Sequence, residues 1–161
     1  MGTRTGDMDP ACVPFVQNIT KYSADEMNNF MNKKSGLLGI SGVSSDLRDV
    51  EDAAAKGNDR ARLAIEMLEY GISKYVGAYT VAMGGLDVLV FTAGIGENSA
   101  ATREAVCKKL EFMGVKIDHD KNNIRGKEAI VSADDSKVKV VVCPTNEELM
   151  IARETKRIAF A

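Results

Sequence analysis

The stretch LDVLVFTAGIGENSAATR, residues 86–103, decides the fold because its character changes twice within a short distance. Residues 86–91 form an apolar run with a single charge, which is typical of a strand covered on both faces of a mixed or parallel sheet. The glycine turn GIGEN, residues 94–98, follows at once, and residues 99–112 have the composition of a helix. The stretch therefore predicts strand, turn and helix in succession, as in an α/β sheet.

The flanking sequence extends this pattern in both directions. Residues 1–57 predict short helices joined by glycine loops, one of them over residues 23–33, and no strand. A long amphipathic helix is expected from Asn58 to the pair Gly84 and Gly85, where two glycines favour a C-terminal cap. Further strands and a last helix are expected after the turn, at residues 115–117, 129–132, 138–142 and 145–158. We therefore expect a helical first part, residues 1–85, and an α/β part, residues 86–161.

Composition and charge exclude several classes of protein. The chain has 161 residues, enough for one domain with a core, and its formal net charge of −2 offers no basic surface for nucleic acid. The longest apolar stretch, residues 75–91, is interrupted by polar and charged residues and by glycines, so we expect no membrane span.

The three cysteines indicate a reducing compartment. Cys12, Cys107 and Cys143 are odd in number, widely spaced and without a C-x-x-C pair, which argues against both a disulfide framework and a zinc site. Residues 1–7 contain no apolar core like that of a signal peptide. The expected location is the cytoplasm.

The glycine turn is the strongest chemical signal in the residues themselves. Gly94 and Gly96 allow main-chain amides to approach a phosphate, and the following helix directs its positive end toward it. A plain βα turn capped by Asn98 or Ser99 explains the same pattern. A dinucleotide site is a further alternative, since Asp118 lies about 20 residues on, where a ribose ligand is expected. The missing third glycine and the position deep in the chain count against that alternative.

A second segment, SGLLGISGVSSDLRD at residues 35–49, is a glycine-rich approach to a helix. Ser44 or Ser45 can cap this helix, and Asp46 favours its dipole. Arg48 opposes the dipole, which predicts a contact outside the helix with a phosphate or with a neighbouring carboxylate.

Two further segments carry single candidate residues. In PTNEE, residues 144–148, Thr145 and Glu148 have capping-box spacing, which leaves Glu147 as the carboxylate that could face a metal ion. In GTRTGDMDP, residues 2–10, Arg4 is a lone cation between glycines. The only histidine, His119, is expected to be a solvated turn residue, so no histidine-based mechanism can be built within this chain.

Taken in order, these four segments resemble the signatures of the acetate kinase family, and the resemblance runs from residue 1 to residue 158. The motifs that carry it are GTRTGDMDP, SGLLGISGVSSDLRD, FTAGIGENS with Arg103 behind it, and PTNEELMIA. The resemblance implies an actin-like ATPase fold, related to ribonuclease H and shared with sugar kinases and Hsp70. It also implies magnesium-dependent transfer of the ATP γ-phosphoryl group to acetate, which yields acetyl phosphate and ADP.

The resemblance also assigns roles to residues. It places the nucleotide on Gly94, Ile95, Gly96, Glu97 and Asn98, and its adenosine side beside Asp46, Leu47 and Arg48. Glu147 matches a magnesium-site glutamate, and Arg4 matches an arginine that binds the transferring phosphoryl group.

Members of this family are more than twice as long, so we expect the chain to be a C-terminal piece whose partner is the missing N-terminal part. The catalytic aspartate, the substrate arginine, the histidines and the first phosphate loop of the family have no counterpart here. The resemblance further implies a homodimer paired through this region. A nucleotide-binding or dimerising module without catalysis, and a dehydrogenase fragment, are the alternatives.

Overall fold

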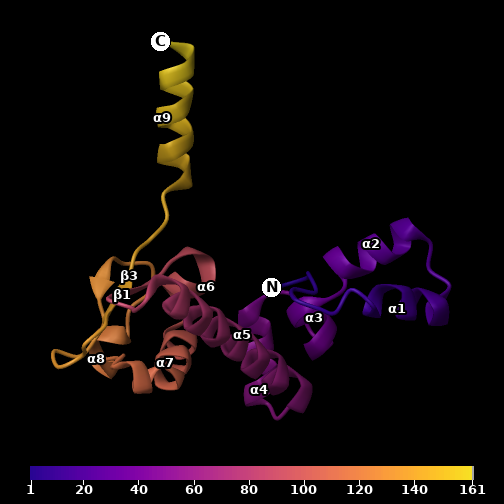
Figure 1. Ribbon diagram of the computed structural model, residues 1–161, viewed down its shortest axis with the longest axis horizontal. Coiled ribbons are helices and arrows are strands. Elements are labelled where there is room, and N and C mark those ends of the chain that lie inside the picture. The colour runs from indigo at the N-terminus through magenta and orange to yellow at the C-terminus, as the bar shows by residue number, and fades with distance from the viewer. Residues whose placement is uncertain (161) are drawn as a thin grey trace. The chain divides into compact units, whose positions relative to one another are not determined.

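The computed structural model describes residues 1–160 and combines helices with one small sheet. The chain divides into two compact units, Met1–Ile72 and Ser73–Ala161, and each is described by itself. The sequence predicted a boundary between a helical part and an α/β part at residues 85 and 86, and that domain boundary stays a prediction. All three strands do follow residue 85 (Figure 1).

The first unit is built from helices. It contains α1 (Cys12–Thr20), α2 (Ala24–Lys33), α3 (Gly36–Ser41), α4 (Leu47–Ala55) and the first half of α5 (Asp59–Met83). No strand occurs in residues 1–57, all of which are described, as the sequence predicts. The expected helix over residues 23–33 is confirmed as α2, because Ser23 and Glu26 form a capping box at its start. The buried apolar side chains of this unit are Met27, Leu37, Leu47, Val50, Ala61 and Ala64.

Helix α5 confirms the long helix expected from residue 58. It ends at the glycine pair, where Gly84 and Gly85 both have positive φ, 76° and 159°. Their amides return to the carbonyls of Val81 and Thr80 at 3.2 and 3.0 Å, which satisfies main-chain groups at the helix end. None of the helices in the described residues is both long enough and apolar enough to cross a membrane.

The second unit contains the sheet, with strand order β1-β3-β2. Strand β1 (Val88–Phe91) pairs in parallel with β3 (Lys139–Val142), and β2 (Ala129–Ile130) pairs antiparallel with β3. The connection from β1 to β3 contains α6 (Ala93–Asn98), α7 (Ala100–Lys109), η1 (Glu111–Met113), α8 (His119–Asn122) and β2. Helix α9 (Glu147–Ala159) follows the sheet. The alternation of helices and strands expected from the sequence is therefore confirmed. The strand expected at residues 115–117 is not formed, because Val115 and Ile117 make only isolated bridges, to Val138 and Ser132.

Strand β1 departs from its prediction in one respect. Leu89 and Phe91 are buried, but Val88 and Val90 are 46% and 51% exposed. The expectation that both faces are covered is therefore wrong for the described residues. Val106, Cys107 and Leu110 of the α7 region are buried together with Val140 and Val142 of β3, so the core of this unit covers one face.

Candidate functional site

The glycine turn lies at the carboxyl end of β1, the edge where parallel sheets gather ligands. The sequence predicted an open turn here, but the structure has a short helix, α6, which begins at Ala93. Ala93 has a φ of 58°, an uncommon conformation for a residue with a side chain. Such outliers are often found at functional sites, and this one is the first residue of α6, directly after the N-cap residue Thr92.

The two glycines of the turn serve different purposes. Neither Gly94 nor Gly96 has a positive φ. A Cβ atom added to Gly96 would lie 3.2 Å from the carbonyl carbon of Phe91, so Gly96 permits the turn to pack closely against β1. A Cβ atom added to Gly94 would meet no atom within 4 Å. The open space beside Gly94 is therefore the place where a ligand could approach the main chain of α6.

Arg103 holds the turn from behind. Its side chain is fully buried, and it donates hydrogen bonds to the carbonyl oxygens of Gly96, Asn122 and Ile124 and to Oδ1 of Asn122, at 2.7–2.9 Å. Burial lowers the pKa of the Arg103 guanidinium below its ordinary value. The four acceptors fix the position of the turn relative to residues 122–124, and no spacing in the sequence signals that contact.

The remaining residues of the turn close it and connect it to the loop that precedes β2. The Asn98 side chain donates from Nδ2 to the carbonyl oxygen of Gly94 at 2.8 Å, and the carbonyl of Ile95 accepts from Ser99 N–H at 2.9 Å. The carbonyl of Glu97 accepts from Gly126 N–H at 3.1 Å. The predicted nucleotide segment is thus held at both of its ends.

Glu97 connects the turn with the segment that carries Glu147. Its Oε1 accepts hydrogen bonds from Thr145 N–H and Thr145 Oγ1 at 2.8 and 3.2 Å. The expected capping box of Thr145 and Glu148 is wrong, because Asn146 caps α9 and its Oδ1 accepts from Leu149 N–H at 3.0 Å. Thr145 instead donates from its amide and its hydroxyl to Glu97.

Glu147 is exposed in the first turn of α9. Among residues 1–160, no three His, Cys, Asp or Glu side chains form a group that could hold a metal ion. Glu147 could therefore supply one carboxylate to a metal ion whose other ligands come from water or phosphate, which is how Mg²⁺ is commonly held.

The first unit contains the other candidate residues. Asp46 caps α4 and accepts from Arg48 N–H at 2.9 Å, while the Arg48 guanidinium binds both Asp46 oxygens at 3.0 and 2.5 Å. These hydrogen bonds lower the pKa of Asp46 to about 2. Arg48 thus contacts a neighbouring carboxylate, one of the two partners expected for it. Leu47 is buried in the core of the unit and could meet a ligand only through its main chain.

The segment that carries Arg4 lies against the glycine-rich segment 35–49. The amides of Ser35, Leu37 and Leu38 donate to the carbonyls of Thr3, Met1 and Gly2 at 2.9–3.1 Å. A Cβ atom added to Gly2 would lie 2.9 Å from the carbonyl oxygen of Ser45, the residue before Asp46. The structure thus brings two of the four predicted segments together, with the Arg4 side chain exposed.

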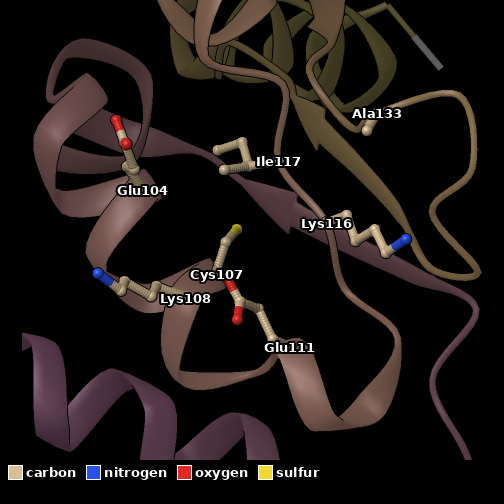
Figure 2. A pocket seen from close by; sticks show the side chains of 7 residues that line it. All are labelled: Glu104, Cys107, Lys108, Glu111, Lys116, Ile117 and Ala133. Atoms are coloured by element: carbon tan, nitrogen blue, oxygen red, sulfur yellow. The ribbon is translucent and has the colours of Figure 1, made fainter.

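A separate cavity of about 570 Å³ lies beside α7, lined by Glu104, Cys107, Lys108, Glu111, Lys116, Ile117 and Ala133 (Figure 2). None of these residues belongs to the predicted site. Burial raises the pKa of Cys107 to about 12, so it remains an unreactive thiol at neutral pH. Lys116 forms an ion pair with Asp135, and Glu104 Oε2 lies 3.1 Å from His119 Nδ1, so these two lining side chains already have partners in the protein.

The structure does not support Asp118 as a ribose ligand, which the dinucleotide alternative requires. Asp118 caps α8 and accepts from the amides of Asp120 and Lys121 at 3.0 Å, which lowers its pKa. Its carboxylate therefore accepts hydrogen bonds from the main chain of its own helix, a role that does not need a ribose. Residues 115–117, which precede Asp118, make only isolated bridges, parallel to Val138 and antiparallel to Ser132, instead of the second parallel strand of a dinucleotide fold.

The chain is similar to known proteins over nearly its whole length. The model of the acetokinase family matches residues 1–153. An acetate kinase from Desulforamulus reducens is 60% identical over 98% of the chain, which corresponds to 40% of that protein. The crystal structure of Porphyromonas gingivalis acetate kinase matches with a TM-score of 0.93 and 54% identity over 99% of the chain and 40% of its own. A propionate kinase structure from Francisella tularensis matches with a TM-score of 0.87 and 44% identity over 96% of the chain and 39% of its own.

The α/β structure is thus a partial domain of the actin-like ATPase fold, and it spans about 40% of the length of the relatives that it matches. The portion matched is their C-terminal one, as the order of the motifs implied. The chain belongs to the acetokinase family.

Proposed function

We propose that the chain is the nucleotide-side portion of an acetate kinase. In this reaction a carboxylate oxygen of acetate attacks the γ-phosphorus of ATP, and the bond to the β–γ bridging oxygen breaks, which gives acetyl phosphate and ADP. The observation that carries the proposal is the position of α6 at the carboxyl end of β1, with open space beside Gly94. Main-chain amides at this place can approach phosphate oxygens without steric obstruction.

The other proposed roles follow the two units. In the second unit, we assign Gly94, Ile95, Gly96 and Asn98 to nucleotide binding. In the first unit, the candidate binding residues are Arg4, Asp46 and Arg48. The exposed guanidinium of Arg4 suits the charge that develops on the equatorial oxygens of a transferring phosphoryl group. The ion pair of Arg48 with Asp46 fixes the guanidinium plane of Arg48 at the start of α4.

Magnesium fits the residues that are present. Glu147 supplies a hard oxygen ligand, and Mg²⁺ usually combines one or two carboxylates with substrate phosphates and water. When bound, the ion would neutralise charge on the β- and γ-phosphates. Glu147 is two residues beyond Thr145, so its Cα lies within about 7 Å of the Cα of Thr145, which Glu97 binds.

The nucleotide site is tested by calorimetric titration of the 161-residue chain with Mg-ATP and with NAD. We expect Mg-ATP to bind and NAD not to bind. Gly94→Ala should weaken Mg-ATP binding tenfold or more, because the new methyl group enters the open space beside α6. Its fold should be unharmed, because alanine is favoured over glycine in a helix by about 0.5–1 kcal/mol.

Gly71→Ala is the matched control, since Gly71 is also helical and a Cβ atom there meets nothing within 4 Å. It should leave the affinity unchanged. The chain alone should form no acetyl phosphate, because phosphoryl transfer needs groups positioned on both sides of the substrates. Tight NAD binding without ATP binding would refute the proposal.

A dimerising role is the second candidate, and the exposed second half of α5 favours it. Tyr75, Tyr79 and Met83 are spaced four residues apart on one face of the helix and are 45%, 61% and 66% exposed. We propose a second copy of the chain as the partner that covers them. Analytical ultracentrifugation should show a dimer for the chain and mostly monomer for Tyr79→Lys, whereas a strict monomer of the unsubstituted chain would contradict this role.

A further inference from the structure

We propose that Glu97 is a positioning residue that joins the nucleotide turn to the segment carrying Glu147, and that it does not itself bind the nucleotide. The proposal deepens the proposed function and rests on it. It replaces the expectation, drawn from the family resemblance, that Glu97 is one of the nucleotide ligands.

The hydrogen bonds of Glu97 argue against a role in binding the nucleotide. Its Oε1 accepts from both donors of Thr145, the amide at 2.8 Å and the hydroxyl at 3.2 Å. The main-chain carbonyl of Glu97 accepts from Gly126 N–H at 3.1 Å. The side chain and the main-chain carbonyl of Glu97 therefore both accept hydrogen bonds from protein groups.

Charge supports the same conclusion. A carboxylate within about 4 Å of a phosphate oxygen is repelled by it even in bulk water, and more strongly near a protein surface. The other residues of the turn, Gly94, Ile95, Gly96 and Asn98, carry no charged side chain. An acid in this position is compatible with ATP if its charge is turned toward neighbouring donors, as it is toward Thr145.

The contact matters because α9 has little else to fix its start. None of the residues in Glu147–Ala159 is buried in the structure. The Cys143 amide is bound to the carbonyl of Phe91 at the end of the sheet, and the next anchored residue along the chain is Thr145. Asn146 then begins the helix, and Glu147 is its first residue. The position of Glu147 is thus set from α6 through Glu97.

The consequence is a coupling between nucleotide and metal. Glu97 belongs to the turn that receives the phosphates, and its carboxylate holds the main chain two residues before the proposed metal ligand. A nucleotide that orders α6 therefore also orders Glu147, and a metal ion on Glu147 favours the same arrangement of α6. Loss of the contact should weaken this mutual effect while leaving each part intact.

Two substitutions separate positioning from direct binding. Glu97→Gln keeps an oxygen acceptor for Thr145 but removes the negative charge, whereas Glu97→Ala removes both. A positioning role requires the acceptor, so the glutamine variant should behave like the unsubstituted chain. A role as metal ligand requires the charge, so the glutamine variant would then resemble the alanine variant. Thr145→Val, which removes the hydroxyl donor but keeps the amide, should give a smaller loss than Glu97→Ala.

The experiment measures ATP affinity of the 161-residue chain by calorimetry, with and without Mg²⁺. In the unsubstituted chain we expect Mg²⁺ to raise the affinity for ATP. In Glu97→Ala this increase should fall at least tenfold, while affinity for ATP without metal changes less than threefold. Glu97→Gln should retain the increase within threefold. The proposal is overturned if Glu97→Ala keeps the full effect of Mg²⁺, or if Glu97→Gln loses it to the same extent as alanine.

Amide hydrogen exchange supplies a readout that needs no ligand. Exchange at Thr145 should be at least tenfold faster in Glu97→Ala than in the unsubstituted chain, and exchange at Val140 in the sheet should be unchanged. Equal exchange at Thr145 in both proteins would overturn the proposal, whether or not nucleotide binds. Failure of the unsubstituted chain to bind ATP would refute the proposed function instead, and the exchange rates would still show whether Glu97 holds Thr145.

Discussion

Replacing Arg103 with methionine is expected to lower the free energy of unfolding of the second unit by about 3–5 kcal/mol. The guanidinium is fully buried and supplies donors to four acceptor sites, three of them main-chain carbonyls. An apolar residue of similar length fills the space but leaves those oxygens without a donor. Because the acceptors remain when the arginine is removed, the usual argument that a buried ion can be exchanged for a hydrophobic side chain does not apply.

The control for this prediction is Arg125→Met. Arg125 is an exposed arginine in the same region, and its Nε is 3.4 Å from Asn98 Oδ1, a long hydrogen bond. Its loss should change stability by less than about 0.5 kcal/mol. Urea unfolding followed by far-ultraviolet circular dichroism measures both variants. An Arg103→Met protein within 1 kcal/mol of the unsubstituted chain would show that water replaces the guanidinium at no cost.

Replacing Gly36 with alanine is expected to release the segment that carries Arg4. Gly36 has a φ of 62°, and a Cβ atom there would lie 2.4 Å from the carbonyl oxygen of Met1 and 2.8 Å from that of Arg4. The left-handed conformation alone costs about 1 kcal/mol for alanine. The clash with main-chain atoms cannot be relieved by rotating a side chain, so the total loss should exceed about 2 kcal/mol.

The difference in stability between Gly36→Ala and Gly57→Ala measures the contribution of the clash. Gly57 has a φ of 92°, but a Cβ atom there meets nothing within 4 Å, so this variant bears the conformational cost alone. Thermal unfolding should place Gly36→Ala well below Gly57→Ala. Trypsin should also cut after Arg4 sooner in Gly36→Ala, as mass spectrometry of timed digests would show. Equal destabilisation of the two variants would contradict the proposed packing of residues 1–4.

Local sequence patterns were enough to predict most of the helices. The capping box at Ser23 and the glycine pair after Met83 are local devices, and the structure places helix ends at both. The alternation of strands and helices after residue 85 was predictable for the same reason. Exposure of Val88 and Val90 was not, because an apolar run has the same composition whether one face of the strand is covered or two.

The site was predictable as segments but not as contacts. Glycine spacing and family motifs indicated the turn, yet the hydrogen bond between Glu97 and Thr145 joins residues 48 positions apart. Arg103 and its acceptors at Asn122 and Ile124 are separated by about 20 residues of helix and loop. No local period relates such positions, and only the folded sheet brings them together.

The exposed valines of β1 also determine how the isolated chain must be handled. In the described residues β1 is an edge strand of the sheet, so one side of its main chain has no neighbouring strand. Val88 and Val90 add an apolar strip along the same strand. Unpaired edges with apolar side chains are templates for strands of other molecules. Concentrated samples should therefore precipitate through β-sheet growth, and a lysine at position 88 or 90 should delay that precipitation without touching the nucleotide turn.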